Sequence, residues 1–218
     1  MPVFMKDGKN VLFIHIPKAA GSTIESTFRK SGYFMGYHDH GHKMPNSMNH
    51  LRRCSPQHMH AEMLERHFLI DKFDLIFTVV RNPYDRIRSE YVMRYGYLSD
   101  RKLMTPFSDW IVQTFEKYRQ NPYIYDNHIR PQTEFITRKC HIFHMEEGIG
   151  NILQKLNRDF DLDLNLEKVE KRLDSSNSSF GNSNSIEIDD TTKRYISTFY
   201  IDDFDRFAYN ENPHGEEK

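Results

Sequence analysis

The sequence predicts an α/β fold in which a mostly parallel sheet is flanked by helices. Two nearly continuous apolar runs, residues 11–16 and residues 74–80, have the pattern of strands covered on both faces. Each run is followed by a turn and then by a helical pattern, and further strand and helix patterns follow along the chain. Strand–turn–helix units that recur in this way, without an internal repeat, are typical of a parallel sheet with crossover helices.

The elements of the first half are delimited by prolines and helix-capping residues. Pro17 ends the first strand, and Ser22 or Thr23 is suited to cap a helix that runs to residue 30. Residues 31–57 contain several histidines and glycines and are expected to form an irregular excursion. Pro83 follows the second strand and suits the first position of a helix that runs to about residue 95.

The remaining elements are predicted from hydrophobic periodicity. Residues 174–186 are rich in Ser and Asn and are expected to form a mobile loop. A third strand is predicted at residues 140–145, and further helices at residues 60–66, 107–120, 149–160, 191–200 and 202–209.

Length and composition narrow the class of protein. The 218 residues correspond to a single domain, residues 1–218, and 30 Lys and Arg against 31 Asp and Glu argue against a protein that coats nucleic acid. No apolar run approaches the roughly 20 residues of a membrane span, and no secretory signal is evident. Two cysteines, Cys54 and Cys140, are too few for a disulfide framework. We expect a cytoplasmic chain without a stable membrane span and leave its oligomeric state open.

The turn after the first strand has the composition of an anion site. Lys18 supplies a charge, Ser22 and Thr23 supply hydroxyl donors, and the small residues Ala19, Ala20 and Gly21 let an anion approach the backbone amides. An ordinary turn with a solvated lysine is the alternative. The lysine precedes the glycine, so this turn is not the nucleotide-binding GxxxxGK[ST] motif.

Arg81 stands at the carboxyl end of the second strand, where ligands bind in open α/β sheets. Ser89 lies two turns into the following helix, and the two side chains are suited to hold one phosphate together. The second strand ends in an arginine where a kinase would place a Mg²⁺-binding aspartate, which favours a sulfate ester over a triphosphate. Arg86 and Arg88 are expected to be surface or salt-bridge residues.

Twelve histidines suggest a metal site, most of all His38, His40 and His42. No cysteine or carboxylate cluster completes a ligand set around them, so a solvated polar loop is favoured and no metal is assigned. His58 and His60 lie just before a predicted helix, between the two anion motifs. A neutral imidazole there is suited to take a proton from a hydroxyl group, and a structural role for both rings is the alternative.

The two anion motifs carry a resemblance to a known family. Residues 13–23, FIHIPKAAGST, resemble the 5′-phosphosulfate loop of sulfotransferases that use 3′-phosphoadenosine-5′-phosphosulfate (PAPS), and residues 80–91, VRNPYDRIRSEY, resemble their 3′-phosphate motif. The set is most similar to carbohydrate sulfotransferases related to the heparan sulfate 2-O- and chondroitin enzymes, in a compact bacterial-type form. The resemblance spans about residues 11–209 and implies a P-loop-like sheet.

The resemblance implies a chemistry and a role for each motif. A sulfuryl group would pass from PAPS to a carbohydrate hydroxyl, leaving 3′,5′-adenosine bisphosphate, with no metal required. Residues 18–23 would hold the phosphosulfate, Lys18 would also act in catalysis, and Arg81 with Ser89 would hold the 3′-phosphate.

The base and the acceptor site follow from the same resemblance. The match to 2-O-type enzymes places His60 narrowly in the position of the base, whereas smaller relatives favour His58. His128, Arg130 and Gln132 are expected on the acceptor side. The alternatives are a nucleotide-dependent kinase of P-loop-like fold and a His-rich metal- or glycan-binding protein.

Overall fold

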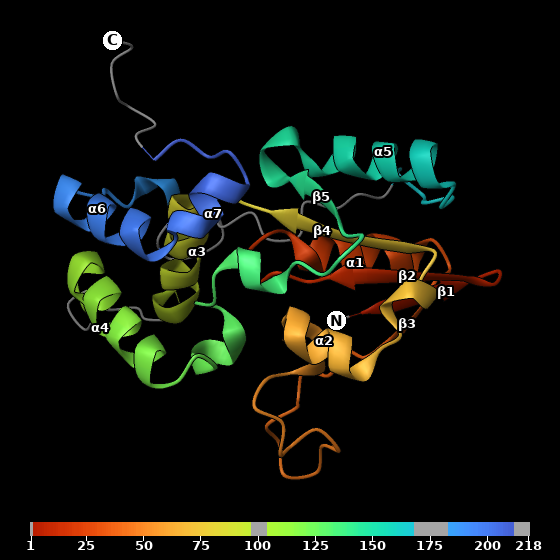
Figure 1. Ribbon diagram of the computed structural model, residues 1–218, viewed down its shortest axis with the longest axis horizontal. Coiled ribbons are helices and arrows are strands. Elements are labelled where there is room, and N and C mark those ends of the chain that lie inside the picture. The colour runs from red at the N-terminus through yellow and green to blue at the C-terminus, as the bar shows by residue number, and fades with distance from the viewer. Residues whose placement is uncertain (1, 97–103, 168–182, 212–218) are drawn as a thin grey trace.

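A computed structural model describes residues 2–96, 104–167 and 183–211. In these ranges five strands form one sheet in the order β3-β1-β2-β4-β5 (Figure 1). The strands are β1 (Val3–Lys6), β2 (Lys9–Ile14), β3 (Phe34–Gly36), β4 (Leu75–Val80) and β5 (His141–His144). β2, β4 and β5 run parallel, whereas β1 is antiparallel to both β2 and β3. The predicted α/β class is confirmed, and the sheet is mixed.

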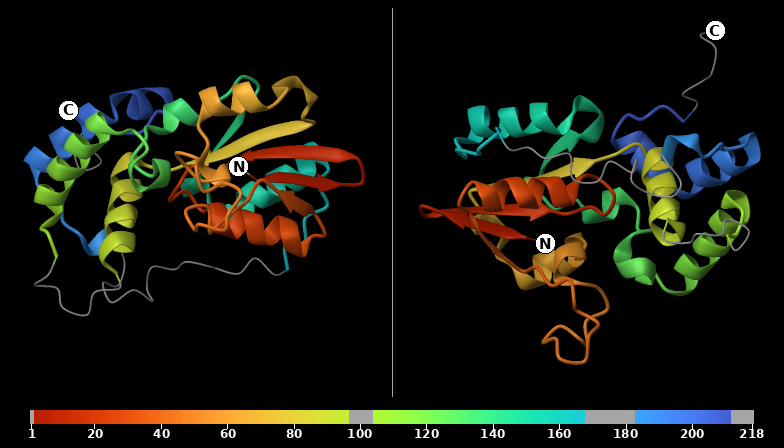
Figure 2. Two further views of the ribbon diagram at one scale, coloured as in Figure 1. Left: turned by 90° about the horizontal axis from the view of Figure 1, so that it is seen from below. Right: turned by 180° about the vertical axis from the view of Figure 1, so that it is seen from behind.

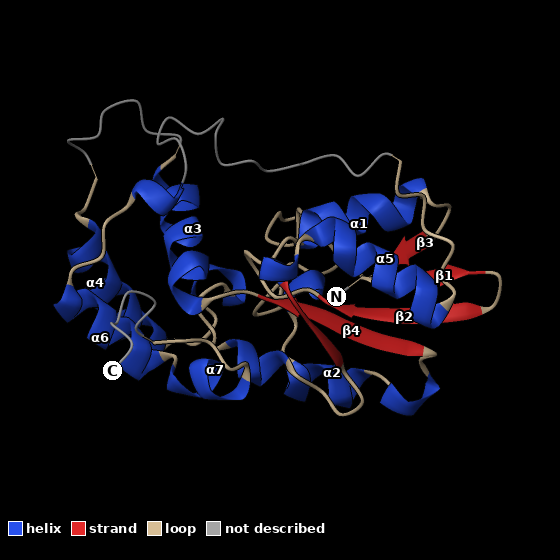
Figure 3. Ribbon diagram, turned by 90° about the horizontal axis from the view of Figure 1, so that it is seen from above, coloured by secondary structure: helices blue, strands red, loops and turns tan. Residues whose placement is uncertain are grey.

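The central strands β2 and β4 are apolar because both faces of the sheet are covered. Helices α1 (Gly21–Lys30) and α5 (Ile149–Phe160) lie over one face, and α2 (Ala61–His67) lies over the other (Figures 2 and 3). Alternate residues of each strand face alternate sides, as the period of two requires. Phe13 and Phe77 pack in the core with α1 and α5, whereas Ile14 and Val80 pack in the core with α2.

A group of helices packs beyond the carboxyl ends of β2 and β4 (Figure 1). It contains α3 (Pro83–Tyr95), α4 (Phe107–Gln120), α6 (Asp190–Phe199) and α7 (Ile201–Arg206). Its core is aromatic and includes Tyr91, Trp110, Phe115 and Tyr200. None of the helices in the described ranges is both long enough and apolar enough to cross a membrane.

Two strands were not predicted from the sequence. β1 forms a hairpin with β2 through Asp7 and Gly8, both with positive φ, as a tight two-residue hairpin turn requires. β3 lies inside residues 31–57, which were expected to be irregular throughout. The predicted mobile loop at residues 174–186 falls mostly outside the described residues, and its described part includes a 3₁₀ turn at Ser183–Ser185.

The prediction that Arg86 is a surface or salt-bridge residue is wrong. Its side chain is only 2% exposed and donates hydrogen bonds to the carbonyl oxygens of Pro17, His128 and Arg130. Burying a guanidinium is tolerable here because three main-chain acceptors surround it. Arg86 therefore ties α3 to the turn after β2 and to the segment around residue 129. Arg88 does form an expected salt bridge, with Asp85 at 3.2 Å, and the pair is partly buried.

We expect Arg86→Ala to lower the free energy of unfolding by about 2–4 kcal/mol, because three buried carbonyl groups lose their donor. Urea unfolding followed by circular dichroism measures the change. Arg88→Ala is the matched control, since loss of one partly exposed pair should cost only about 1 kcal/mol. Equal losses in the two variants would contradict the role given to Arg86.

Candidate active site

The turn after β2 is shaped by left-handed backbone. Lys18 and Ala20 have φ of 68° and 62°, and α1 begins at Gly21 with Ala20 in the N-cap position. The predicted cap by Ser22 or Thr23 is therefore wrong, because the backbone turns earlier and brings both residues into the first turn of the helix. No side chain caps this helix start. A helix start of this kind, preceded by small residues, is suited to bind an anion.

His15 packs directly against the start of α1. A Cβ atom added to Gly21 would lie 2.1 Å from His15 Nε2, so only glycine fits beside this ring. The other ring nitrogen, Nδ1, is 2.6 Å from the buried carboxylate of Glu25, and His38 Nε2 lies 3.4 Å from the same carboxylate. Burial raises the pKa of Glu25, but the hydrogen bonds to His15 and His38 outweigh it and hold the pKa well below its usual value. His38 is thus part of the site and not of a solvated loop, which corrects the expectation for this histidine.

Arg81 meets the same turn from the neighbouring strand. Its guanidinium donates to the carbonyl oxygen of Lys18 at 3.3 Å, and its main chain exchanges two hydrogen bonds with the side-chain amide of Gln132, of 3.0 and 2.8 Å. Burial lowers the pKa of Arg81. The structure therefore brings Lys18 and Arg81 together, and it uses Gln132, expected on the acceptor side, to fix the backbone of Arg81.

Helix α3 carries a buried carboxylate, Glu90, whose charge acts on Lys18. Glu90 is fully buried, pairs with Arg94 at 2.6 Å and binds His128 Nδ1 at 2.6 Å. Burial raises the pKa of Glu90, but the charges of His128, Arg94 and Lys18 hold it at about 2. Burial lowers the pKa of Lys18, and Glu90 opposes that shift. Ser89 is half-buried beside Glu90 in the chain.

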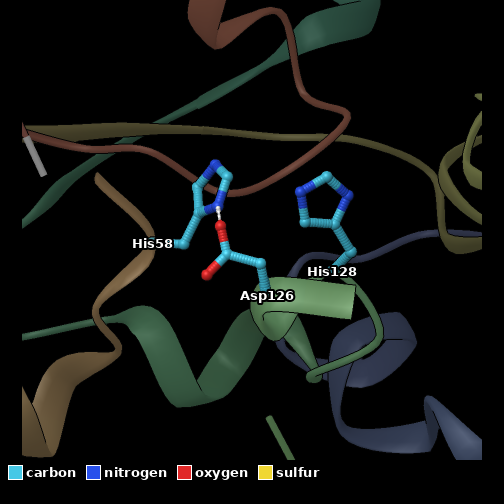
Figure 4. Close-up of side chains that lie close together, drawn as sticks. All are labelled: His58, Asp126 and His128. Carbon is cyan, nitrogen blue, oxygen red and sulfur yellow. Dashed lines mark hydrogen bonds and ion pairs between the residues drawn. The ribbon is translucent and has the colours of Figure 1, made fainter. Parts of the chain in front are cut away.

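His58 lies at the centre of the site (Figure 4). Its ring packs edge-on against those of His15 and His128, with centroids 4.9 Å apart in both cases. Nδ1 is 2.7 Å from Asp126 Oδ2, and Asp126 also accepts from the backbone amide and hydroxyl of Ser55. Burial lowers the pKa of His58 to about 3, so the ring is neutral near neutral pH and donates Nδ1–H to the carboxylate.

Asp126 is held in this place by an unusual backbone. Tyr125, Asp126 and Asn127 have φ of 50°, 60° and 66° in succession. Left-handed conformation is costly for residues other than glycine and tends to persist where function needs it. The side-chain amide of Asn127 donates to the carbonyl oxygen of His58 at 2.8 Å. Residues 126 and 127 therefore hold both the ring and the main chain of His58 by hydrogen bonds.

His60 and Arg130 take other neighbours. His60 Nε2 is 3.8 Å from Glu62, and its ring lies against Tyr123. Arg130 is buried, pairs with Glu134 and donates to the side chain of Asn127 at 3.2 Å. Of the three residues expected on the acceptor side, the structure places only His128 against the central imidazole.

Several residues of the site were not assigned from the sequence, namely His15, Glu25, Glu90 and Asp126. His15 carried a usable signal, because it stands at the end of a buried parallel strand. The three carboxylates sit inside patterns that predict nothing more than ordinary helix or turn positions.

Comparison with known proteins gives one match. The model of the sulfotransferase family aligns with residues 1–210. No curated protein and no solved structure matches the chain. Because the family match covers nearly the whole chain, including both anion motifs and the buried imidazole between them, this protein belongs to the sulfotransferase family.

Proposed function

We propose that this sulfotransferase moves the sulfuryl group of PAPS to a hydroxyl of a carbohydrate acceptor. The observation that carries the proposal is the convergence of Lys18 and Arg81 at neighbouring strand ends, beside a buried imidazole held by Asp126. Cations suit the two phosphate groups of the donor, and an imidazole suits the activation of a neutral hydroxyl.

The donor would lie across the two strand ends. Its phosphosulfate would bind the turn of Lys18, Ala19, Ala20 and Gly21 and the first helical residues Ser22 and Thr23, and its 3′-phosphate would bind Arg81 and Ser89. In this arrangement the charges of Lys18 and Arg81 would neutralise the anion, so the proposal assigns no metal to donor binding.

The transfer step divides between His58 and Lys18. His58 Nε2 accepts the proton of the acceptor hydroxyl as the acceptor oxygen bonds to sulfur. The bond between sulfur and the bridging oxygen breaks, and its electron pair leaves on the phosphate of 3′,5′-adenosine bisphosphate. Lys18 stabilises that developing charge, which is where a preorganised cation lowers a barrier most.

The choice of His58 over His60 rests on their neighbours. A base works best when its second ring nitrogen is bonded, because the bond fixes the tautomer and the ring orientation. His58 has that bond to Asp126 at 2.7 Å, whereas His60 Nδ1 is buried without a hydrogen-bond partner. His128, beside His58, is the residue best placed to contact the acceptor.

The direct test is transfer of radiolabelled sulfate from PAPS to a panel of neutral and anionic oligosaccharides. Sulfate appearing on a sugar, without added metal, is the expected result. Phosphate transfer from ATP that depends on Mg²⁺ would contradict the proposal and favour a kinase.

Nucleotide preference tests the role of Arg81. We expect 3′,5′-adenosine bisphosphate to bind more tightly than 5′-AMP by about 1.5–3 kcal/mol, because only the former offers a 3′-phosphate. Titration calorimetry measures both. Arg81→Gln should remove most of the difference, and the exposed Arg138→Gln should leave it intact; equal affinities in the unaltered chain would refute the assignment.

Lys18→Ala should lower kcat by about a hundredfold or more while changing the affinity for 3′,5′-adenosine bisphosphate by less than about tenfold. The reason is that the lysine acts most strongly as the leaving phosphate gains charge. Steady-state kinetics and calorimetry together separate the two effects. Lys72, an exposed lysine just before the amino end of β4, gives the control Lys72→Ala. An unchanged kcat in Lys18→Ala would show that the lysine is only solvated.

The two histidines can be separated by matched substitutions. His58→Gln should lower kcat by about 10²–10⁴-fold with nucleotide affinity preserved, whereas His60→Gln should lose less than about tenfold. Single-turnover rates at saturating donor measure the step itself. The reverse order of losses would make His60 the base.

A further inference from the structure

A buried nitrogen of His42 lacks a hydrogen-bond partner. His42 is 6% exposed, and its Nε2 atom is buried without such a partner, 3.8 Å from Asp126 Oδ1. A buried polar atom without a hydrogen bond lowers the stability of a protein, so such atoms are rare and often have a functional role. The sequence placed His42 in a solvated loop, and that expectation is wrong because the ring is buried against Asp126.

Two more donors face the same carboxylate. One donor atom from each of His58, Asp126 and His128 can be chosen so that all three lie within 4.8 Å of one another (Figure 4). His58 turns Nδ1 toward Asp126, and His128 has its own Nδ1 bonded to Glu90, which leaves Nε2 as its ligand atom. His42 Nε2 lies 3.8 Å from the other oxygen of Asp126 and would be the fourth ligand. Imidazole nitrogens and carboxylate oxygens are ligands that Zn²⁺ takes in proteins.

The neighbours of the proposed ligands are like those found around metal sites in proteins. Histidine ligands in proteins usually donate their second nitrogen to a carboxylate, and ligating carboxylates are themselves hydrogen-bonded. Glu90 supplies the first of these partners to His128, and Ser55 supplies the second to Asp126. The successive left-handed residues Tyr125, Asp126 and Asn127 hold the carboxylate at the centre of the set.

We propose that His42, His58, Asp126 and His128 bind one Zn²⁺ ion and that the bound ion blocks transfer. Tetrahedral zinc with bonds of about 2.0–2.1 Å needs ligand atoms closer together than 4.8 Å, so the side chains must draw inward by side-chain rotation. His58 exchanges its hydrogen bond to Asp126 for the metal, and His42 gains the partner that it lacks.

Inhibition follows from the tautomer of His58. A metal on Nδ1 leaves the proton of the neutral ring on Nε2, and Nε2 then has no lone pair to accept a proton from the acceptor hydroxyl. This second half of the proposal rests on the proposed function, since it treats His58 as the base. The proposal that Zn²⁺ binds depends only on the four ligand residues and not on the proposed function.

Zinc binding is measured on the full chain by competition with a chromogenic zinc indicator and needs no nucleotide or acceptor. We expect one equivalent of Zn²⁺ to bind with a micromolar or lower Kd. His42→Ala, Asp126→Asn and His128→Ala should each weaken binding by at least about tenfold, because each removes one ligand. Circular dichroism checks that the variants fold.

His40→Ala is the matched control, because His40 lies two residues from His42 but is exposed and contacts only the His38 ring among the described aromatic pairs. Its zinc affinity should equal that of the unaltered chain. Equal weakening by His40→Ala and His42→Ala would mean that a loose His-rich stretch binds the metal and would overturn the site. Absence of binding at 100-fold excess of Zn²⁺ over protein would overturn it as well.

Co²⁺ gives a second readout that does not depend on affinity. Tetrahedral Co²⁺ bound to this set should absorb intensely in the visible range, and the band should disappear in His42→Ala. A weak octahedral spectrum in the unaltered chain would contradict the four-ligand site.

The inhibition arm compares sulfuryl transfer with and without stoichiometric Zn²⁺ and after addition of a chelator. Loss of transfer that the chelator reverses is expected in the unaltered chain and in His40→Ala. Full activity at zinc saturation would overturn inhibition while leaving the binding site intact. Absence of transfer under all conditions would count against the proposed function, and the binding measurements would still decide the metal site.

Discussion

The parallel pairing of β2 with β4 is the constraint on which the site depends. The register sets Ile14 opposite Thr78, and the Thr78 hydroxyl donates to the carbonyl oxygen of Ile14 at 2.7 Å. Both strands therefore end at the same edge, which delivers Lys18 and Arg81 to one place although 63 residues separate them. Arg86 then fastens the helical group to that edge through main-chain carbonyls, so packing of the helices and placement of the cations are coupled.

Buried carboxylates orient the imidazole rings of the site. Each of three neighbouring imidazoles has its Nδ1 atom on its own acid, in the pairs His15–Glu25, His58–Asp126 and His128–Glu90. A buried acid would ordinarily become protonated, but hydrogen bonds and neighbouring cations keep these three ionised. These bonds give each ring a defined orientation in the absence of zinc, which lowers the reorganisation needed for chemistry.

Much of the fold could be predicted because its central strands and helices carry strong local patterns. The two motifs at residues 13–23 and 80–91 each include the end of such a strand. β1 was missed although Asp7 and Gly8 are a hairpin signal, since the strand is short and ends in polar residues. The burial of Arg86 could not be predicted, because its three acceptors come from distant main-chain atoms. The same holds for Asp126, whose bond to His58 spans 68 residues and depends on a backbone conformation that the sequence does not encode locally.

The contact between His15 and the start of α1 links two positions that a mutational scan would treat as separate. The imidazole fills the volume in which a side chain at position 21 would begin, so a larger residue there requires a smaller or displaced one at position 15. Positions 15 and 21 therefore form one unit of sequence variation. A library that randomises this turn one codon at a time would mistake steric exclusion by the histidine for an intrinsic demand for glycine.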